Sequence, residues 1–103
     1  MAALRDPANT VWLSVVTVWE ILIKAHLGKL SVRLPLAEII AQQQANGVQI
    51  LTVTLPHSLA MDGLPPIHKD PFDRLLIAQA IAEGAELVSA DHLIARYPVR
   101  LLW

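Results

Sequence analysis

Three acidic residues stand at positions where carboxylates can act together: Glu20, Asp73 and Asp91. Glu20 and Asp73 lie in early turns of two predicted helices, and Asp91 lies just beyond a predicted strand. Because functional groups of α/β sheets gather at the carboxyl ends of strands, the three acids could converge on one edge. Clustered carboxylates in a chain without Cys favour Mg²⁺ or Mn²⁺, since these ions prefer oxygen ligands. Phosphodiester hydrolysis is the usual chemistry of such a site.

Asp73 and Glu20 also have a structural explanation. Asp73 suits the acid of a capping box in a helix for which Asp70 is the N-cap and Pro71 the first residue. Glu20 precedes Lys24 by four residues, a spacing at which an exposed ion pair stabilises a helix by about 0.3 to 0.5 kcal/mol. Spacing alone leaves the metal site and the structural interpretation open.

The segment 70–82 organises the chain. It predicts a helix that is apolar on nearly every side, which is typical of a helix packed on more than one face. Residues three and four apart share a helix face, so Asp73 lies in line with Leu76 and Ile77. A carboxylate at the buried edge of a core helix is costly unless a cationic group meets it. The sequence therefore places Asp73 at the edge of a central helix.

Strands and helices alternate along the rest of the chain. Residues 1–5 are predicted as the tail of a helix, ended by a turn at 6–9 that contains a proline. The predicted strands are 11–14, 48–51, 86–89 and 99–103, and the remaining predicted helices are one capped by Ser14 or Thr17 that runs to about 27, 36–46, 55–62, and a short one between 92 and 98. This alternation predicts an α/β sandwich with a mostly parallel sheet, in a single domain over 1–103.

Composition limits the classes of protein that fit. The 103 residues can bury roughly 65% of their unfolded surface as one domain. Apolar residues make up 54% and charged residues 17%, so we expect apolar surface to be hidden by a partner. A net charge of −1 predicts no long-range positive field, so nucleic-acid contacts must come from local basic clusters. The absence of Cys excludes disulfides, and no apolar run approaches the ~20 residues of a membrane span, so we predict a cytoplasmic protein.

Three motifs follow one another in the chain: Val18-Trp19-Glu20-Ile21, the run DPFDRLLIAQA over 70–80, and Leu87-Val88-Ser89-Ala90-Asp91. In order and spacing they resemble PIN-domain ribonucleases of the VapC toxin type, across essentially the whole chain. The resemblance implies a PIN-like three-layer sandwich and Mg²⁺- or Mn²⁺-dependent cleavage of RNA, held in check by a cognate antitoxin of a toxin-antitoxin system. Carried over by position, Glu20, Asp73 and Asp91 would be the catalytic metal ligands.

The resemblance also suggests supporting roles. Asp70 would cap or support the central helix at the same opening, and Ser14 and Thr17 would orient the acids through hydrogen bonds. The residues that could contact RNA phosphates are Lys24, His26, Lys29 and Arg33 in the first basic cluster, and His68 and Lys69 in the loop before the central helix. Solvated surface residues without a ligand explain the same basic pattern.

The chain departs from the family at its start. The family normally begins with a central strand that ends in an aspartate, followed by a helix, and this chain has neither ahead of Met1. We therefore expect an N-terminal strand and an acid ligand to be missing, which would impair metal binding and activity. Open sheet edges and apolar faces would then favour a homo-oligomer. The alternative function is a non-catalytic α/β interaction module that binds an antitoxin-like partner without cleaving RNA.

Overall fold

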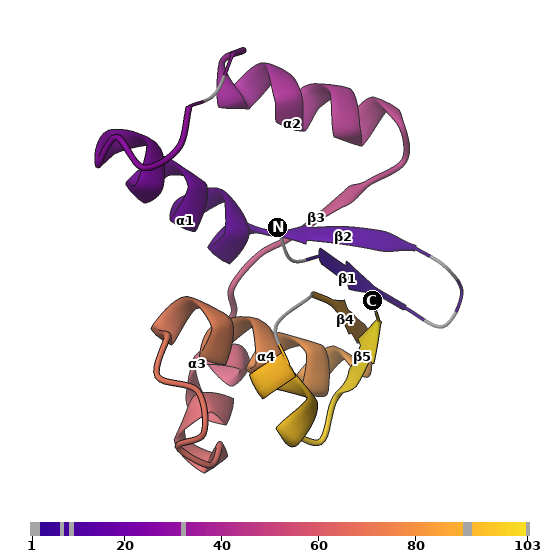
Figure 1. Cartoon of the computed structure of the whole chain (residues 1–103). Coiled ribbons are helices and arrows are strands. Elements are labelled where there is room, and N and C mark those ends of the chain that lie inside the picture. The colour runs from indigo at the N-terminus through magenta and orange to yellow at the C-terminus, as the bar shows by residue number, and fades with distance from the viewer. Residues whose placement is uncertain (1–2, 7, 9, 32, 90–91, 103) are drawn as a thin grey trace.

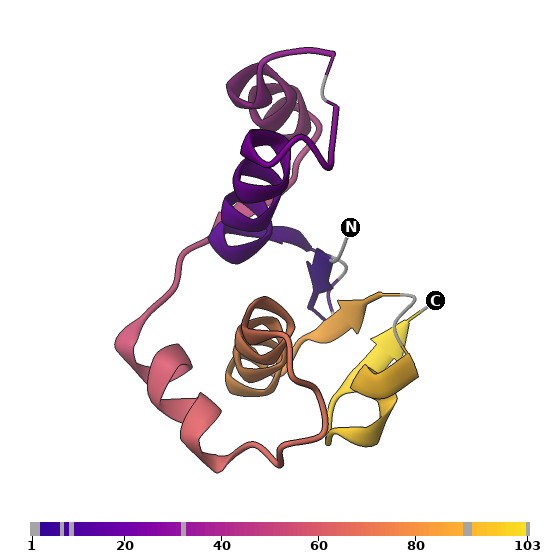
Figure 2. The same cartoon turned by 60° about the vertical axis from the view of Figure 1, so that its left-hand side comes forward.

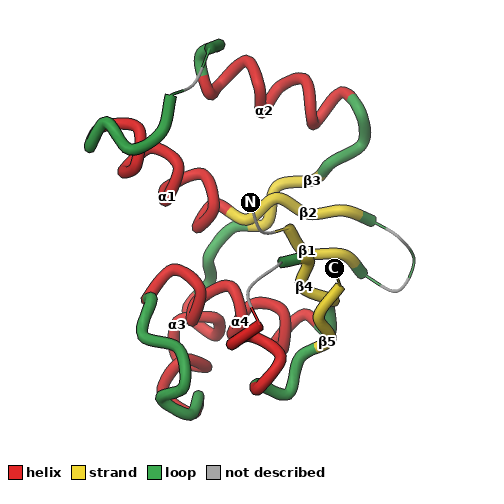
Figure 3. Tube along the Cα trace, viewed as in Figure 1, coloured by secondary structure: helices red, strands yellow, loops and turns green. Residues whose placement is uncertain are grey.

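The computed structural model describes residues 3–6, 8, 10–31, 33–89 and 92–102. Within these ranges the chain alternates between short strands and helices (Figures 1 and 3). The elements in chain order are β1 (Ala3–Arg5), β2 (Val11–Ser14), α1 (Val15–His26), α2 (Leu36–Ala45), β3 (Gln49–Leu51), α3 (Leu55–Ala60), the 3-10 turn η1 (Met61–Gly63), α4 (Pro71–Glu83), β4 (Glu86–Val88), the 3-10 turn η2 (His92–Arg96) and β5 (Arg100–Leu102).

The strands form one mixed sheet in the order β3-β2-β1-β4-β5. The outer pairs β2–β3 and β4–β5 are parallel, whereas β1 runs antiparallel to both of its neighbours, β2 and β4. The prediction of a mostly parallel sheet is therefore confirmed only for the two outer pairs. The reason lies in the short connection 6–10, because a turn of this length can join only antiparallel strands. Asp6 closes that turn by accepting a hydrogen bond from the Thr10 N–H at 2.8 Å.

The predicted helix tail over 1–5 is wrong, because Ala3–Arg5 is the central strand β1. Leu4 is fully buried in the core and pairs with Trp12 on one side and Leu87 on the other. Backbone pairing on both edges and burial of Leu4 override the local helical preference of this short segment. Among the described residues the centre of the sheet is formed by β1, and the missing N-terminal strand stays a prediction.

Helix α4 lies at the centre of the fold, as predicted (Figure 2). The Asp70 side chain caps its start, Pro71 fills its first position, and Gly84 ends it with a positive φ of 61°. Leu76 through Ala80 are all buried, so the helix packs on more than one side. The residues that share the core with α4 are Leu4, Val16, Ala85, Leu87, Ile94 and Tyr97.

Helix α2 lies on the opposite side of the strands from α3 (Figure 1). Helix α1 also packs beside α4, because Val16 shares the core with Leu76 and Ile77. Ser14 caps α1 by accepting a hydrogen bond from the Val16 N–H, and Gly28 follows its end with a φ of 72°. None of the residues of α2, all of which the structure describes, is buried. The three-layer sandwich therefore stays a prediction, because this helix packs loosely.

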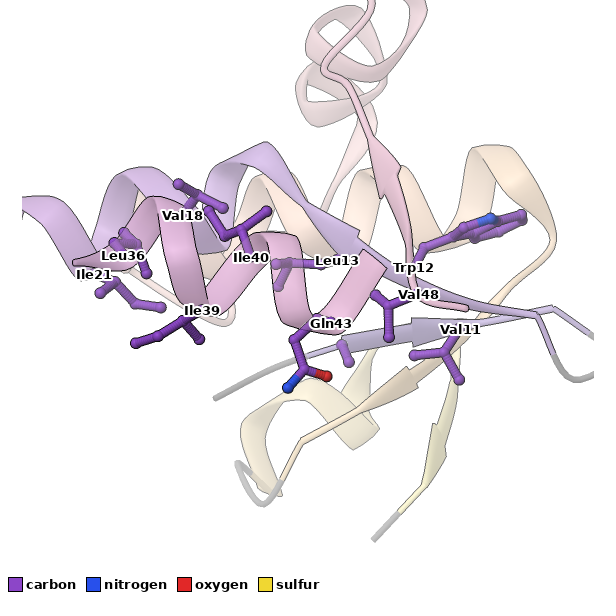
Figure 4. Close-up of a pocket in the computed structure, with 11 residues that line it drawn as sticks. Val11, Trp12, Leu13, Val18, Ile21, Leu36, Ile39, Ile40, Gln43 and Val48 are labelled. Carbon is purple, nitrogen blue, oxygen red and sulfur yellow. The ribbon is translucent and has the colours of Figure 1, made fainter. Parts of the chain in front are cut away.

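An apolar groove of about 220 Å³ lies between α1 and α2 and is also lined by residues of β1 and β2 (Figure 4). Val18 and Ile21 of α1 line it from one side, and Ile39 and Ile40 of α2 from the other. The remaining lining residues are Ala3, Val11, Trp12, Leu13, Leu36, Gln43 and Val48. None of the described residues that line the groove is acidic.

The other predicted elements are found with small shifts. The predicted helix 55–62 is α3 followed by η1, and its cap is Thr54, whose side chain accepts from the His57 N–H. None of the helices that the structure describes combines the length and apolar character needed to cross a membrane.

Candidate metal centre

The first turn of α4 is fixed by one carboxylate. Asp70 Oδ1 accepts hydrogen bonds from the backbone N–H groups of Phe72 and Asp73, at 2.8 and 3.2 Å. These N–H groups have no partner inside the helix, so the cap satisfies both of them. Asp70 therefore has the capping role that the sequence predicted, and it orients the turn that carries Asp73.

Three carboxylates meet where α1 packs beside the start of α4. Glu20, Asp70 and Asp73 each offer one ligand atom, and these atoms all lie within 4.8 Å of one another. The three side chains are partly exposed, so the cluster is open to solvent. Two of the three predicted acids are thus brought together, and Asp70 joins them. Asp91, the third, lies outside the described residues.

The donor set of this cluster fits a hard divalent cation. All three groups are carboxylates, which supply the oxygen ligands that Mg²⁺ and Mn²⁺ prefer. Carboxylates this close repel one another, and a bound cation would remove that repulsion. Glu20, Asp70 and Asp73 can therefore hold such an ion.

Glu20 also forms the ion pair that its spacing predicted. Its Oε2 lies 3.4 Å from Lys24 Nζ, one helical turn further along α1. The structural interpretation of Glu20 is therefore confirmed, and the same carboxylate nevertheless belongs to the acidic cluster. The Lys24 side chain is 53% exposed and the Glu20 side chain 19%, so we expect this pair within one helix to contribute little to stability.

His68 is the residue that meets Asp73. Its Nε2 lies 3.1 Å from Asp73 Oδ2, and the residue is only 9% exposed. Grouping His68 with the exposed basic residues was therefore wrong about its burial. The available signal was its position, because Pro65 and Pro66 stiffen the loop that brings His68 to the start of α4.

The loop that carries His68 is fixed by Arg74 and Tyr97. Arg74 Nη1 donates to the Pro65 carbonyl at 3.0 Å and to the His68 carbonyl at 3.4 Å, and Nη2 donates to the carbonyls of Met61 and Leu64. The Tyr97 hydroxyl accepts from the His68 N–H at 2.7 Å and donates to the Pro65 carbonyl at 2.8 Å. The loop over 61–69 is thus tied to α4 and to the turn after η2.

The PIN domain family model matches residues 1–99. The chain belongs to the PIN domain family. No curated protein matches the chain, and no solved structure does. Membership of this family indicates a nuclease function in general terms, and PIN domains generally use divalent metal ions. The acidic cluster gives this PIN domain a place for such an ion.

Ser14 and Thr17 are buried in this PIN domain. The Ser14 hydroxyl donates to Gln79 Oε1 at 2.5 Å, and Gln79 Nε2 lies 3.3 Å from His57 Nδ1. These contacts join α1 to α4 within the core. Ser14 therefore acts on Glu20 indirectly, because it holds the start of the helix that carries Glu20. The predicted orienting role of Thr17 stays a prediction.

Five of the predicted RNA-contact residues are exposed: Lys24, His26, Lys29, Arg33 and Lys69. Trp19, next to Glu20, is 55% exposed, and its ring meets Phe72 edge to face with centroids 5.0 Å apart. This contact joins α1 to the first turn of α4. RNA contact by the basic residues stays a prediction.

Proposed function

We propose that this PIN domain is a divalent-metal-dependent endoribonuclease, the toxin of a toxin-antitoxin system, which acts in the cytoplasm as a single domain over 1–103. The observation that carries the proposal is the convergence of Glu20, Asp70 and Asp73 in a chain of the PIN family. The reaction class follows from the donor set, because clustered carboxylates that hold Mg²⁺ or Mn²⁺ are typical of phosphodiester hydrolysis.

In this proposal Glu20 and Asp73 are catalytic ligands, and Asp91 completes them by family resemblance. Asp70 adds negative charge to the site and holds the first turn of α4. A bound Mg²⁺ or Mn²⁺ supplies Lewis-acid chemistry to the phosphodiester. The exposed basic residues would contact the RNA backbone, since phosphate contacts carry most of the affinity of sequence-independent binding.

The test is RNA cleavage by the purified chain with a matched pair of variants. In Mn²⁺ we expect the wild type to cleave a pool of structured RNAs, and EDTA to abolish cleavage. Asp73→Asn removes one charge from the cluster and should abolish cleavage, whereas Asp62→Asn makes the same change at an exposed acid outside it. Equal cleavage by the wild type and Asp73→Asn, or cleavage that persists in EDTA, would refute the proposal.

A second candidate function is the non-catalytic module that binds an antitoxin-like partner. The observation that favours it is the apolar groove between α1 and α2, together with the exposed α1 side chains Val15, Trp19 and Leu22. Absence of RNA cleavage by a folded wild-type chain would favour this function over the nuclease. Light scattering at micromolar concentration tests the proposed homo-oligomer, and a strictly monomeric mass would contradict it.

A further inference from the structure

We infer that His68 is a positioning residue for the metal centre, which holds Asp73 in its ligating orientation by donating a hydrogen bond to Oδ2. The inference rests on the proposed function, because it assigns a role toward the ion that Glu20, Asp70 and Asp73 would bind. It differs from the RNA-contact role that the sequence suggested for this residue.

The two imidazole nitrogens of His68 have different partners. Nδ1 accepts a hydrogen bond from the Asp70 backbone N–H at 3.1 Å, so it carries no proton. We assign the tautomer with the proton on Nε2 from this hydrogen bond. Nε2 then donates to Asp73 Oδ2 at 3.1 Å. One ring thus contacts the cap residue of α4 and a carboxylate of the cluster.

The position of the ring is set by its backbone. The His68 N–H donates to the Tyr97 hydroxyl, and the His68 carbonyl accepts from Arg74. Tyr97 itself is buried, and its hydroxyl is tied to the Pro65 carbonyl. The imidazole therefore has little freedom to leave Asp73, which is what a residue that orients a metal ligand requires.

The bond does two things for Asp73. It fixes the side-chain torsions of the carboxylate, so that its orientation does not have to be selected when an ion binds. It also stabilises a negative charge that stands beside the carboxylates of Glu20 and Asp70. Both effects preorganise the ligand in the absence of the ion.

His57 provides a matched control because its two ring nitrogens also face a backbone N–H and a carboxylate, with Gln79 Nε2 as a further neighbour of Nδ1. Its Nδ1 accepts from the Thr54 N–H at 3.1 Å, and its Nε2 lies 2.8 Å from Glu83 Oε1. His57 is 1% exposed. Its partner Glu83 is the last residue of α4, at the opposite end of the helix from Asp70 and Asp73. A general effect of losing a buried histidine would therefore appear at both sites.

The experiment measures Mn²⁺ affinity from the amount of free ion in electron paramagnetic resonance titrations, without any RNA. His68→Asn keeps an acceptor for the Asp70 N–H but loses the donor to Asp73, and we expect the dissociation constant to rise roughly tenfold. His68→Gln can still donate to Asp73, and we expect it to stay within about threefold of the wild type. His57→Gln should not change Mn²⁺ affinity, and thermal melts establish that each variant is folded at the titration temperature.

The results separate the inference from the function on which it rests. Equal Mn²⁺ affinity of His68→Asn and wild type, or equal weakening in His68→Asn and His68→Gln, would overturn the positioning role while the metal centre stands. Weakening in His57→Gln as large as in His68→Asn would also overturn it. A wild-type chain that does not bind Mn²⁺ would refute the metal centre itself, and the inference with it.

Discussion

The two sides of the molecule are stabilised in different ways. At the start of α4, hydrogen bonds made by polar side chains fix a loop, a helix end and the carboxylates of Asp70 and Asp73. Between α1 and α2 the side chains that line the open groove are mostly apolar, and no residue of α2 is buried. Directional hydrogen bonds hold a geometry that chemistry needs, whereas a loosely packed apolar face leaves surface for association. The contrast is testable with equal changes on the two sides.

The largest difference should come from removing a leucine side chain on each side. Leu76 is fully buried in α4, so Leu76→Ala should lower the free energy of unfolding by about 3 kcal/mol. Leu36 lines the groove and is only half-buried, so Leu36→Ala should cost about 1 kcal/mol or less. Urea unfolding followed by circular dichroism measures both. Similar losses for the two variants would mean that α2 packs as firmly as α4.

An arginine substitution should show the second largest difference. Arg74→Lys keeps the charge but loses the planar fork that donates to several carbonyls, and we expect a loss of about 2 kcal/mol. Arg33→Lys, in the exposed connector before α2, should stay within about 0.5 kcal/mol of the wild type. The same urea experiment applies. If Arg74→Lys unfolds like the wild type, the hydrogen bonds of Arg74 do not fix the loop.

The link between the two sides is Ser14. Ser14→Ala removes the cap of α1 and the buried bond to Gln79, which should cost about 1 to 2 kcal/mol. Because Ser14 holds α1 against α4, we also expect weaker Mn²⁺ binding through displacement of Glu20. Thr54→Ala removes the cap of α3 instead, and it should destabilise the protein without weakening Mn²⁺ binding. Mn²⁺ titration measures the affinity of both variants. Equal Mn²⁺ affinities of Ser14→Ala and Thr54→Ala would show that the position of Glu20 does not depend on the cap of α1.

The smallest effect concerns the Glu20–Lys24 ion pair on α1. Lys24→Gln should change the free energy of unfolding by about 0.5 kcal/mol or less, because the Lys24 side chain is 53% exposed and the pair lies within one helix. Mn²⁺ affinity should not fall, since Glu20 keeps its charge and loses a competing cation. Calorimetric titration with Mn²⁺ gives the comparison. A marked loss of affinity would show that Lys24 is needed to orient Glu20.

Local signals predicted the part of the fold that they control. Asp70, Pro71 and Gly84 mark the start and end of α4, and their effects act within one helical turn. Strand β1 was missed because Ala3, Leu4 and Arg5 all favour a helix locally, whereas pairing with β2 and β4 decides their conformation. The pattern of residue types within β1 does not indicate which strands it will pair with.

The candidate site was also predicted only in part: its acids were identified from the sequence, and the role of His68 was not. Glu20 and Asp73 were identified from residue type, position and family resemblance, and Asp70 was identified as a cap before it was found within the cluster. The role of His68 depends on Tyr97 and on backbone groups brought close by the fold. Hydrogen bonds to backbone atoms leave no trace in residue spacing, so this support could not be read from the sequence.

The central position of β1 has a consequence for how the chain folds. The β1–β2 hairpin closes a short loop and can form early, but Leu4 must also pair with Leu87 near the other end of the chain. Closing so long a loop costs entropy before contacts compensate for it, so this pairing is expected late in folding. Until it forms, the two parallel pairs of the sheet are separate, and β1 and β4 are open edges at which another chain can pair. Misassembly during synthesis would therefore begin at the middle of the finished sheet.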